Sequence, residues 1–482
     1  MVSLVKNELC KIFKKKAIKV LCLVVLLICA INFGSFKLMD SLDAMLESDD
    51  YIDMLEDSLD TYDLTDPAEL GWYISDKITV ENHKYLKEYD TDSWQRAVLE
   101  EVIAEDITCI VNAEVSKQTD LYNECKARLD TYKEEVNSHD WKYFANKELT
   151  ELKDEKNALE SLLLETSDEE KHELELSLKL VNLKIEGAQY RLDNDIPYGP
   201  SKSSEIINSY VQLGSQYYTY NMNKKVKTDD EIANEKRMKS EFYVVKYQLE
   251  NDIDVSDTIS ASEMLKFDAS TVIFYIIIIV VIIASSSICD EFNNGTIKQL
   301  LLRPYKRGKI LASKWIATFI VFLLFSLYYY VVTALTYGLA LGFDTYSNPL
   351  VIYDFSIDAV REINVFVYLL INFVTLIPYY VVFLNIALLV AVITGNGAAS
   401  LGGTLMFYFA TTILNETFTI LNKPWLQFFP TLCFDWTYYL FGGSGPVKYC
   451  ELWSSVLVTV SIIVLLYVVA HIVFKKKDIK NQ

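Results

Sequence analysis

The chain has 482 residues, 51% of them hydrophobic, and a formal net charge of −20. Its long uncharged apolar runs exclude an ordinary water-soluble protein and indicate membrane spans. The acidity belongs to one region, because residues 37–267 hold 26 basic against 53 acidic side chains. Such a region should avoid nucleic acid, and a solvated helical surface is the simplest account of its charge.

The amino terminus joins a basic segment to an apolar run. Residues 1–16 alternate apolar side chains with five lysines at helical spacing, which predicts an amphipathic interfacial helix on the cytoplasmic side. Residues 17–36 are long enough for transmembrane span 1. A cleaved signal peptide is the alternative, but the run is long and no small-x-small site follows it. We expect an uncleaved anchor with the amino terminus inside.

Residues 37–267 are predicted to form an extracellular, acidic, helical domain. Leucine, isoleucine and valine recur at helical spacing over long stretches, and glycine is nearly absent between Gly71 and Gly187. Both ends of the region return to the membrane, so the helices should run antiparallel and pack in part as coiled coils.

The eight cysteines include no CxxC pair. Cys109 and Cys125 fall in what reads as one continuous helix, where sixteen residues would hold them too far apart to bridge. Cys433 and Cys450 share a predicted outer loop, which leaves a disulfide between them open. The four histidines are dispersed, so no zinc site is expected.

Five further apolar runs complete a six-span pattern. The cytoplasmic pieces 1–19, 289–314 and 475–482 hold 16 Lys and Arg against 4 Asp and Glu, so both termini should be cytoplasmic. The predicted fold is mainly α, a six-span membrane domain with a large helical extracellular domain between spans 1 and 2. The remaining segments are span 2 at 268–288, a cytoplasmic loop at 289–314, spans 3 to 6 at 315–342, 364–394, 398–420 and 455–474, an aromatic interfacial or re-entrant outer segment at 421–454, and a cytoplasmic tail at 475–482.

The cytoplasmic loop 289–314 carries a short helix pattern of its own. Asn294 and Gly295 form a turn signal, and Thr296 can cap a new helix. Leu300 and Leu301 lie on its apolar face, and Pro304 ends it. The segment predicts an amphipathic helix presented to the cytoplasm, with a plain positive-inside loop as the alternative.

The pattern of this loop resembles the first cytoplasmic loop of membrane (permease) subunits of type 2 ATP-binding-cassette exporters, of the Gram-positive kind with a large extracellular domain. In that family the loop is a coupling helix that docks on a separate ATPase. The resemblance implies a coupling role for the matching residues here, which are Glu291, Gly295, Thr296, Lys298, Leu300, Leu301, Arg303 and Pro304.

The resemblance implies a dimeric permease in the plasma membrane of a bacterium, formed with a second copy or a homologous permease. It would move a hydrophobic or amphipathic substrate, such as an antimicrobial peptide or a lipid-like molecule, outward. ATP and Mg²⁺ would bind the partner ATPase, and membrane lipid would surround the spans. As a hypothesis, Gly295 is needed for the turn, and Glu291 makes a polar contact with the ATPase.

No motif for chemistry occurs in the chain itself. GxxxxGK[ST], HExxH and GxSxG are all absent from the sequence. We therefore expect no enzyme activity and no cofactor or metal on this chain. A non-transporting sensor or scaffold that signals through its extracellular helical domain is the alternative function.

Three polar residues fall within predicted spans and would be costly in lipid, namely Asn372, Asn385 and Glu416. They could line a pathway, but interhelical hydrogen bonding is favoured for the asparagines, and Glu416 lies near the outer end of its span. The tyrosines 328–330 and 379–380 could line the same pathway, although packing is the simpler role.

Overall fold

The computed structural model describes residues 1–46, 48–165, 171–222, 229–251, 253, 260–293 and 305–477. The chain divides into two units. We call residues 1–33 with 259–482 the spanning unit, and residues 34–258 the inserted unit.

Within these described residues, six helices are long and apolar enough to cross a membrane, which confirms the six predicted apolar spans and indicates a membrane protein. Each predicted span lies within or almost within one of them. They are α2 (Lys16–Leu46), α11 (Ala261–Asn293), α13 (Arg307–Leu341), α14 (Val365–Thr394), α15 (Gly397–Leu421) and α16 (Leu452–Lys476).

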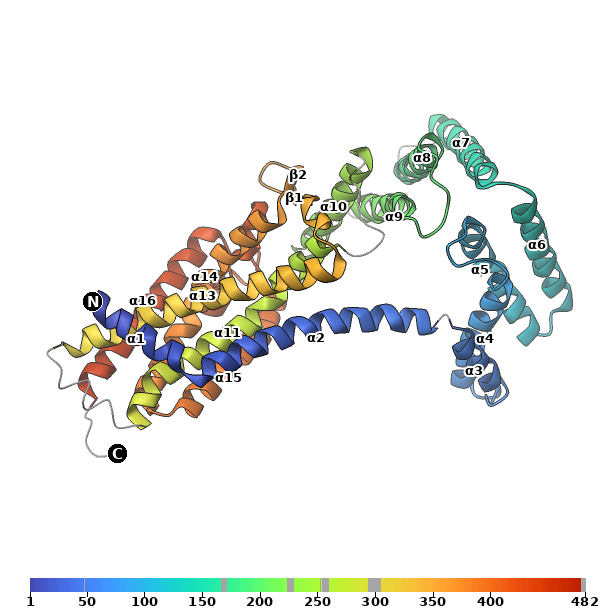
Figure 1. The fold of residues 1–482 in the computed structure, drawn as a ribbon. Helices are drawn as coiled ribbons and strands as arrows, with labels where there is room; N and C mark the ends of the chain where they lie inside the picture. The colour runs from blue at the N-terminus through green and yellow to red at the C-terminus, as the bar shows by residue number, and fades with distance from the viewer. Residues whose placement is uncertain are drawn as a thin grey trace. The chain divides into compact units, whose positions relative to one another are not determined.

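The spanning unit is organised around α11 and α14, which pack on each other and on their neighbours (Figure 1). One apolar core joins all the spans except α15 and receives side chains of α15 at its edge. Burial differs between the spans: 67% of the apolar stretch of α11 is buried inside the protein, against 17% of the apolar stretch of α15 and of α16. The apolar faces of α15 and α16 therefore suit contact with lipid or another chain.

Helix α1 (Val2–Lys14) packs along α13 in the spanning unit (Figure 1). Its buried residues are Leu4, Glu8 and Ile12, which recur every fourth position and so share one face. The predicted amphipathic helix thus exists, and the face it buries against protein includes a carboxylate.

The connection between α13 and α14 contains a β-hairpin, which no pattern described above predicts. Strands β1 (Leu350–Asp354) and β2 (Ala359–Ile363) pair antiparallel, with Leu350 opposite Ile363. The 3-10 helix η1 (Asp344–Ser347) lies in the same connection. Three more 3-10 helices lie between α15 and α16, namely η2 (Pro424–Phe428), η3 (Pro430–Cys433) and η4 (Thr437–Gly442). The hairpin meets η4 where the Phe355 N–H donates to the Phe441 carbonyl at 2.7 Å.

The inserted unit is helical, as predicted, and its helices pack on their sequence neighbours from α3 to α6 and from α7 to α10. Separate apolar clusters hold its parts together, one along α4 to α6 and another along α8 to α10. The helices are α3 (Asp49–Leu59), α4 (Pro67–Leu86), α5 (Trp94–Val115), α6 (Thr119–Ser138), α7 (Trp141–Glu165), α8 (Lys171–Asp193), α9 (Lys202–Met222) and α10 (Asp229–Glu250).

Cys109 and Cys125 form a disulfide with a Cα–Cα distance of 6.3 Å, so the sequence-based prediction that they cannot bridge was wrong. The error came from reading one helix where there are two. Helix α5 ends at Val115, Lys117 turns the chain with φ at 59°, and α6 then packs back along α5. Cys433 and Cys450, the pair for which the sequence left a disulfide open, are both buried free thiols.

Candidate functional site

Four charged side chains form an ion-paired cluster at the end of α11, which we call the ion-pair network: Glu8, Glu291 and Lys314, which are buried, and Lys11, whose side chain is 41% exposed. Lys314 Nζ lies 2.9 Å from Glu8 Oε2 and 2.9 Å from Glu291 Oε2. Lys11 Nζ lies 2.8 Å from the other oxygen of each carboxylate. The cluster is neutral, and its charges join α1, α11 and α13.

Burial sets the electrostatics of the ion-pair network. The Lys314 side chain is 1% exposed, and those of Glu8 and Glu291 are 6% and 11% exposed. Burial raises the pKa of Glu8, but Lys314 and Lys11 outweigh it and hold that pKa below its usual range. Burial likewise opposes the charge of Lys11, while Glu291 and Glu8 raise its pKa. Both groups are therefore charged at neutral pH.

A second ion pair extends the contact between the amino terminus and the end of α11. Lys15 Nζ lies 2.7 Å from Asp290 Oδ2 and donates to the carbonyl of Ser286 at 3.0 Å. Cations near the last carbonyls of a helix are stabilising because they oppose its dipole. Lysines of the amino-terminal segment thus hold the last turns of α11, just before residue 294.

The start of α13, on the other side of residues 294–304, also makes hydrogen bonds to other helices. Arg307, which starts α13, donates to the carbonyls of Lys475 and Lys477 at 3.1 Å each. Lys477 donates in turn to the carbonyls of Val392 at 2.7 Å and Ile393 at 3.0 Å, at the end of α14. The start of α13 is therefore connected to the ends of α16 and α14.

The predicted coupling residues fall partly outside the described structure. Glu291 lies in the ion-pair network, where its carboxylate pairs with Lys11 and Lys314 of the same chain. The others lie outside the described residues: Gly295, Thr296, Lys298, Leu300, Leu301, Arg303 and Pro304.

The three polar residues of the spans have different environments. Asn385 accepts a hydrogen bond from Trp315 Nε1 at 2.8 Å and donates to the carbonyl of Ile463 at 3.4 Å, which links α14 to α13 and α16. Asn372 is buried, with 7% exposure. Glu416 is exposed on α15.

The sequence analysis missed Glu8 and Lys314 as site residues. Glu8 lies four residues after Leu4 and four before Ile12, on the apolar stripe of α1. An acid on an apolar stripe signals a buried partner, and that signal was present in the sequence. Lys314 reads as the last residue of a basic loop, and only the packing of α1 against α13 shows that it is buried.

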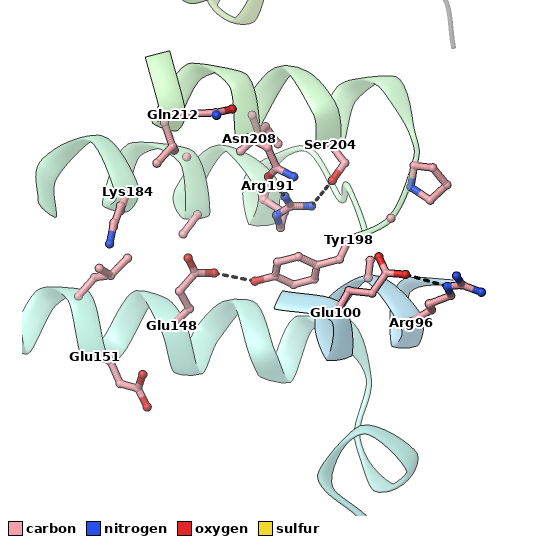
Figure 2. Close-up of a pocket in the computed structure, with 18 of the residues that line it drawn as sticks. Arg96, Glu100, Glu148, Glu151, Lys184, Arg191, Tyr198, Ser204, Asn208 and Gln212 are labelled. Carbon is pink, nitrogen blue, oxygen red and sulfur yellow. Dashed lines mark hydrogen bonds and ion pairs between the residues drawn. The ribbon is translucent and has the colours of Figure 1, made fainter. Parts of the chain in front are cut away.

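The inserted unit contains a second candidate site, a polar cleft of about 1020 Å³ between α5, α7, α8 and α9 (Figure 2). Glu148, Glu151 and Glu155 line it from one face of α7, and Lys184 lies across from them on α8. The lining also includes the apolar side chains of Leu152 and Ile207.

Arg191 organises one end of this cleft (Figure 2). It is 2% exposed, and its guanidinium donates to Ser204 Oγ at 3.0 Å and to the Pro197 carbonyl at 3.0 Å. Its carbon centre lies 4.1 Å from the centre of the Tyr198 ring, whose hydroxyl donates to Glu148 at 2.7 Å. Arg191 thus fixes the loop between α8 and α9 against α7.

Neither site has the composition of a metal centre. Among the residues that the structure describes, no group of three or more His, Cys, Asp or Glu could hold a metal ion. The ion-pair network can transmit movement between helices, and the cleft can accept a polar or cationic ligand.

Comparison with known proteins places the chain in a family. No curated protein and no solved structure matches it. One family model matches residues 210–480, a span that includes five of the six apolar helices. The chain therefore belongs to the DUF2705 family, whose description is "Protein of unknown function".

Proposed function

We propose that this chain is the permease subunit of an ATP-binding-cassette exporter, driven by a separate ATPase subunit. The observation that carries the proposal is the ion-pair network, which ties α1 to both helices that flank residues 294–304. A segment that receives force must pass it to the spans. Buried charge pairs suit this role, because separating one partner leaves an uncompensated charge in an apolar setting.

The other flank supports the same mechanism. The contacts of Arg307 and Lys477 connect the start of α13 with the ends of α16 and α14. A shift of residues 294–304 would therefore reach α1, α11, α13, α14 and α16 together. The chain carries no nucleotide-binding loop, so the energy must come from a partner that binds ATP and Mg²⁺.

The proposal includes a bacterial plasma membrane with both termini in the cytoplasm and the inserted unit outside. The basic pieces at 1–19, 289–314 and 475–482 support this orientation. The Cys109–Cys125 disulfide supports it independently, because disulfides persist in oxidising compartments.

The partners that we propose are the ATPase, membrane lipid and a second permease copy or homologous permease. The exposed apolar faces of α15 and α16 are the surfaces that lipid or a second permease would cover. The exported substrate would be hydrophobic or amphipathic, of the antimicrobial-peptide or lipid-like class.

Photo-crosslinking tests the docking role directly. A photoreactive amino acid at position 298 should capture an ATP-binding protein in native membranes, identified by mass spectrometry. The matched control is position 357 in the β1–β2 turn, where the side chain of Ile357 is 61% exposed and no such adduct is expected. Absence of an ATPase adduct from position 298 would overturn the proposal.

A functional assay complements the crosslink. The Gly295→Leu variant should lose the stimulation of the partner ATPase while its insertion into the membrane remains normal. Stimulation equal to that of the wild type would remove the docking role of the segment.

The alternative function is a non-transporting sensor, and the cleft in the inserted unit is the observation that favours it. ATP-dependent loss of a labelled amphipathic peptide from vesicles separates the two functions. A sensor would bind the peptide without moving it.

A further inference from the structure

The interface between α13 and α14 buries polar atoms that have no hydrogen-bond partner among the described residues. These are the hydroxyls of Tyr330 on α13 and Tyr380 on α14, and the side-chain oxygen of Asn372 on α14. Tyr380 has 0% exposure and Asn372 has 7%. A buried polar atom without a partner is unfavourable, and such atoms in native proteins commonly bond to ordered water.

The two tyrosines belong to one continuous layer of aromatic contacts, and Asn372 directly precedes Phe373 of this layer in α14. The ring of Tyr330 lies 5.9 Å from that of Phe373, which lies 6.1 Å from Phe322. Phe322 in turn lies 5.3 Å from Tyr380. Pro378 is in the same part of α14, and its missing N–H leaves one main-chain carbonyl without its usual helical donor. The layer is therefore rich in hydrogen-bonding capacity that the apolar side chains cannot meet.

The hydroxyls of Thr318 and Tyr329 on α13 also have no hydrogen-bond partner among the described residues, whereas two polar groups nearer the ends of this helix do. Near one end, Trp315 Nε1 donates to Asn385 at 2.8 Å. Near the other end, the hydroxyl of Tyr337 donates to Asp268 at 2.8 Å. The unmatched atoms lie between these two levels, so the deficit is local rather than a general property of the interface.

We infer that this stretch of the α13–α14 interface is a binding site for ordered water, held by the hydroxyls of Tyr330 and Tyr380 and by the amide of Asn372. Phenol hydroxyls donate and accept, and a side-chain carbonyl accepts, so the ligand must do both. Water meets this requirement, and a lipid tail does not. The inference does not depend on the proposed transport function.

The sign of a stability change tests the inference. If the hydroxyl of Tyr380 bonds to water, Tyr380→Phe should lower the Tm of the detergent-purified full-length chain by about 2–4 °C, since a hydrogen bond is lost. If the hydroxyl is unsatisfied, the same change removes a desolvated group and the Tm should stay constant or rise. A constant or higher Tm for both Tyr380→Phe and Tyr330→Phe would overturn the inference. Tyr337→Phe is the matched control and should lower the Tm, because its hydroxyl has a protein partner.

Radiolytic labelling provides a second readout. Brief X-ray exposure creates hydroxyl radicals from bound water in place, so Tyr380 should be oxidised faster than Tyr337. Both side chains have 0% exposure, so bulk solvent does not distinguish them. Oxidation of Tyr380 at or below the rate of Tyr337 would overturn the inference.

Discussion

Replacement of Lys314 by methionine removes one cation from the buried ion-pair network. Methionine keeps the length of the side chain and can pack in an apolar setting. The change deletes the pairs with Glu8 and Glu291 at 2.9 Å each, together with a hydrogen bond to the Ser287 carbonyl at 2.7 Å. Lys11 then faces two carboxylates alone, so the cluster changes from neutral to a net charge of −1.

The expected cost follows from burial. With Lys314 1% exposed and Glu8 6% exposed, solvent screens the remaining charge weakly. Removing one partner of a buried pair costs about 3–5 kcal/mol. At about 2 °C per kcal/mol for a large chain, the Tm should fall by roughly 6 °C or more. Thermal unfolding of the detergent-purified protein, followed by intrinsic fluorescence, measures this shift.

A double-mutant cycle with Glu8→Gln separates the ion pair from simple loss of packing. Glu8→Gln alone leaves a net charge of +1, whereas the double variant is neutral again with Lys11 and Glu291 still paired. The double variant should therefore cost about 1–3 kcal/mol less than the sum of the single changes. Costs that add within about 0.5 kcal/mol would refute the electrostatic account of the cluster.

Three further predictions concern pH and the inserted unit. The pKa of Glu8 is lower in the folded state than in the unfolded chain, so this carboxylate stabilises the fold above about pH 4.3. The stabilisation is lost as the pH falls through the folded-state pKa of Glu8. The Tm difference between wild type and Glu8→Gln should therefore close as the pH falls below about 4.3. Arg191→Met should lower the free energy of unfolding of the inserted unit by roughly 3 kcal/mol, because it removes buried hydrogen bonds, and amide exchange in α8 and α9 should become faster. The control is Lys184→Met on the exposed side of α8, which should change this free energy by no more than about 0.5 kcal/mol. Cys109 and Cys125 should resist alkylation until a reductant is added, and replacing both with serine should cost about 3 kcal/mol; alkylation of both without reductant would exclude the disulfide.

The sequence determined the parts of this protein that depend on local pattern. Six long apolar runs predict six spanning helices, because main-chain groups in an apolar medium must bond within their own segment. Basic pieces at 1–19 and 475–482 set the expected orientation, and helical spacing predicts the helices of the inserted unit. These features need no knowledge of which helices touch.

Only the tertiary structure decided which distant residues meet. Glu8 and Lys314 are separated by 306 positions, and only the packing of α1 on α13 shows that they pair with each other. Cys109 reaches Cys125 because a turn at Lys117 divides one apparent helix into two. Short strands such as β1 have too few residues for a firm periodic signal, and their partner β2 fixes them. Contacts between residues far apart in sequence depend on how helices pack, and composition or periodicity does not encode that packing.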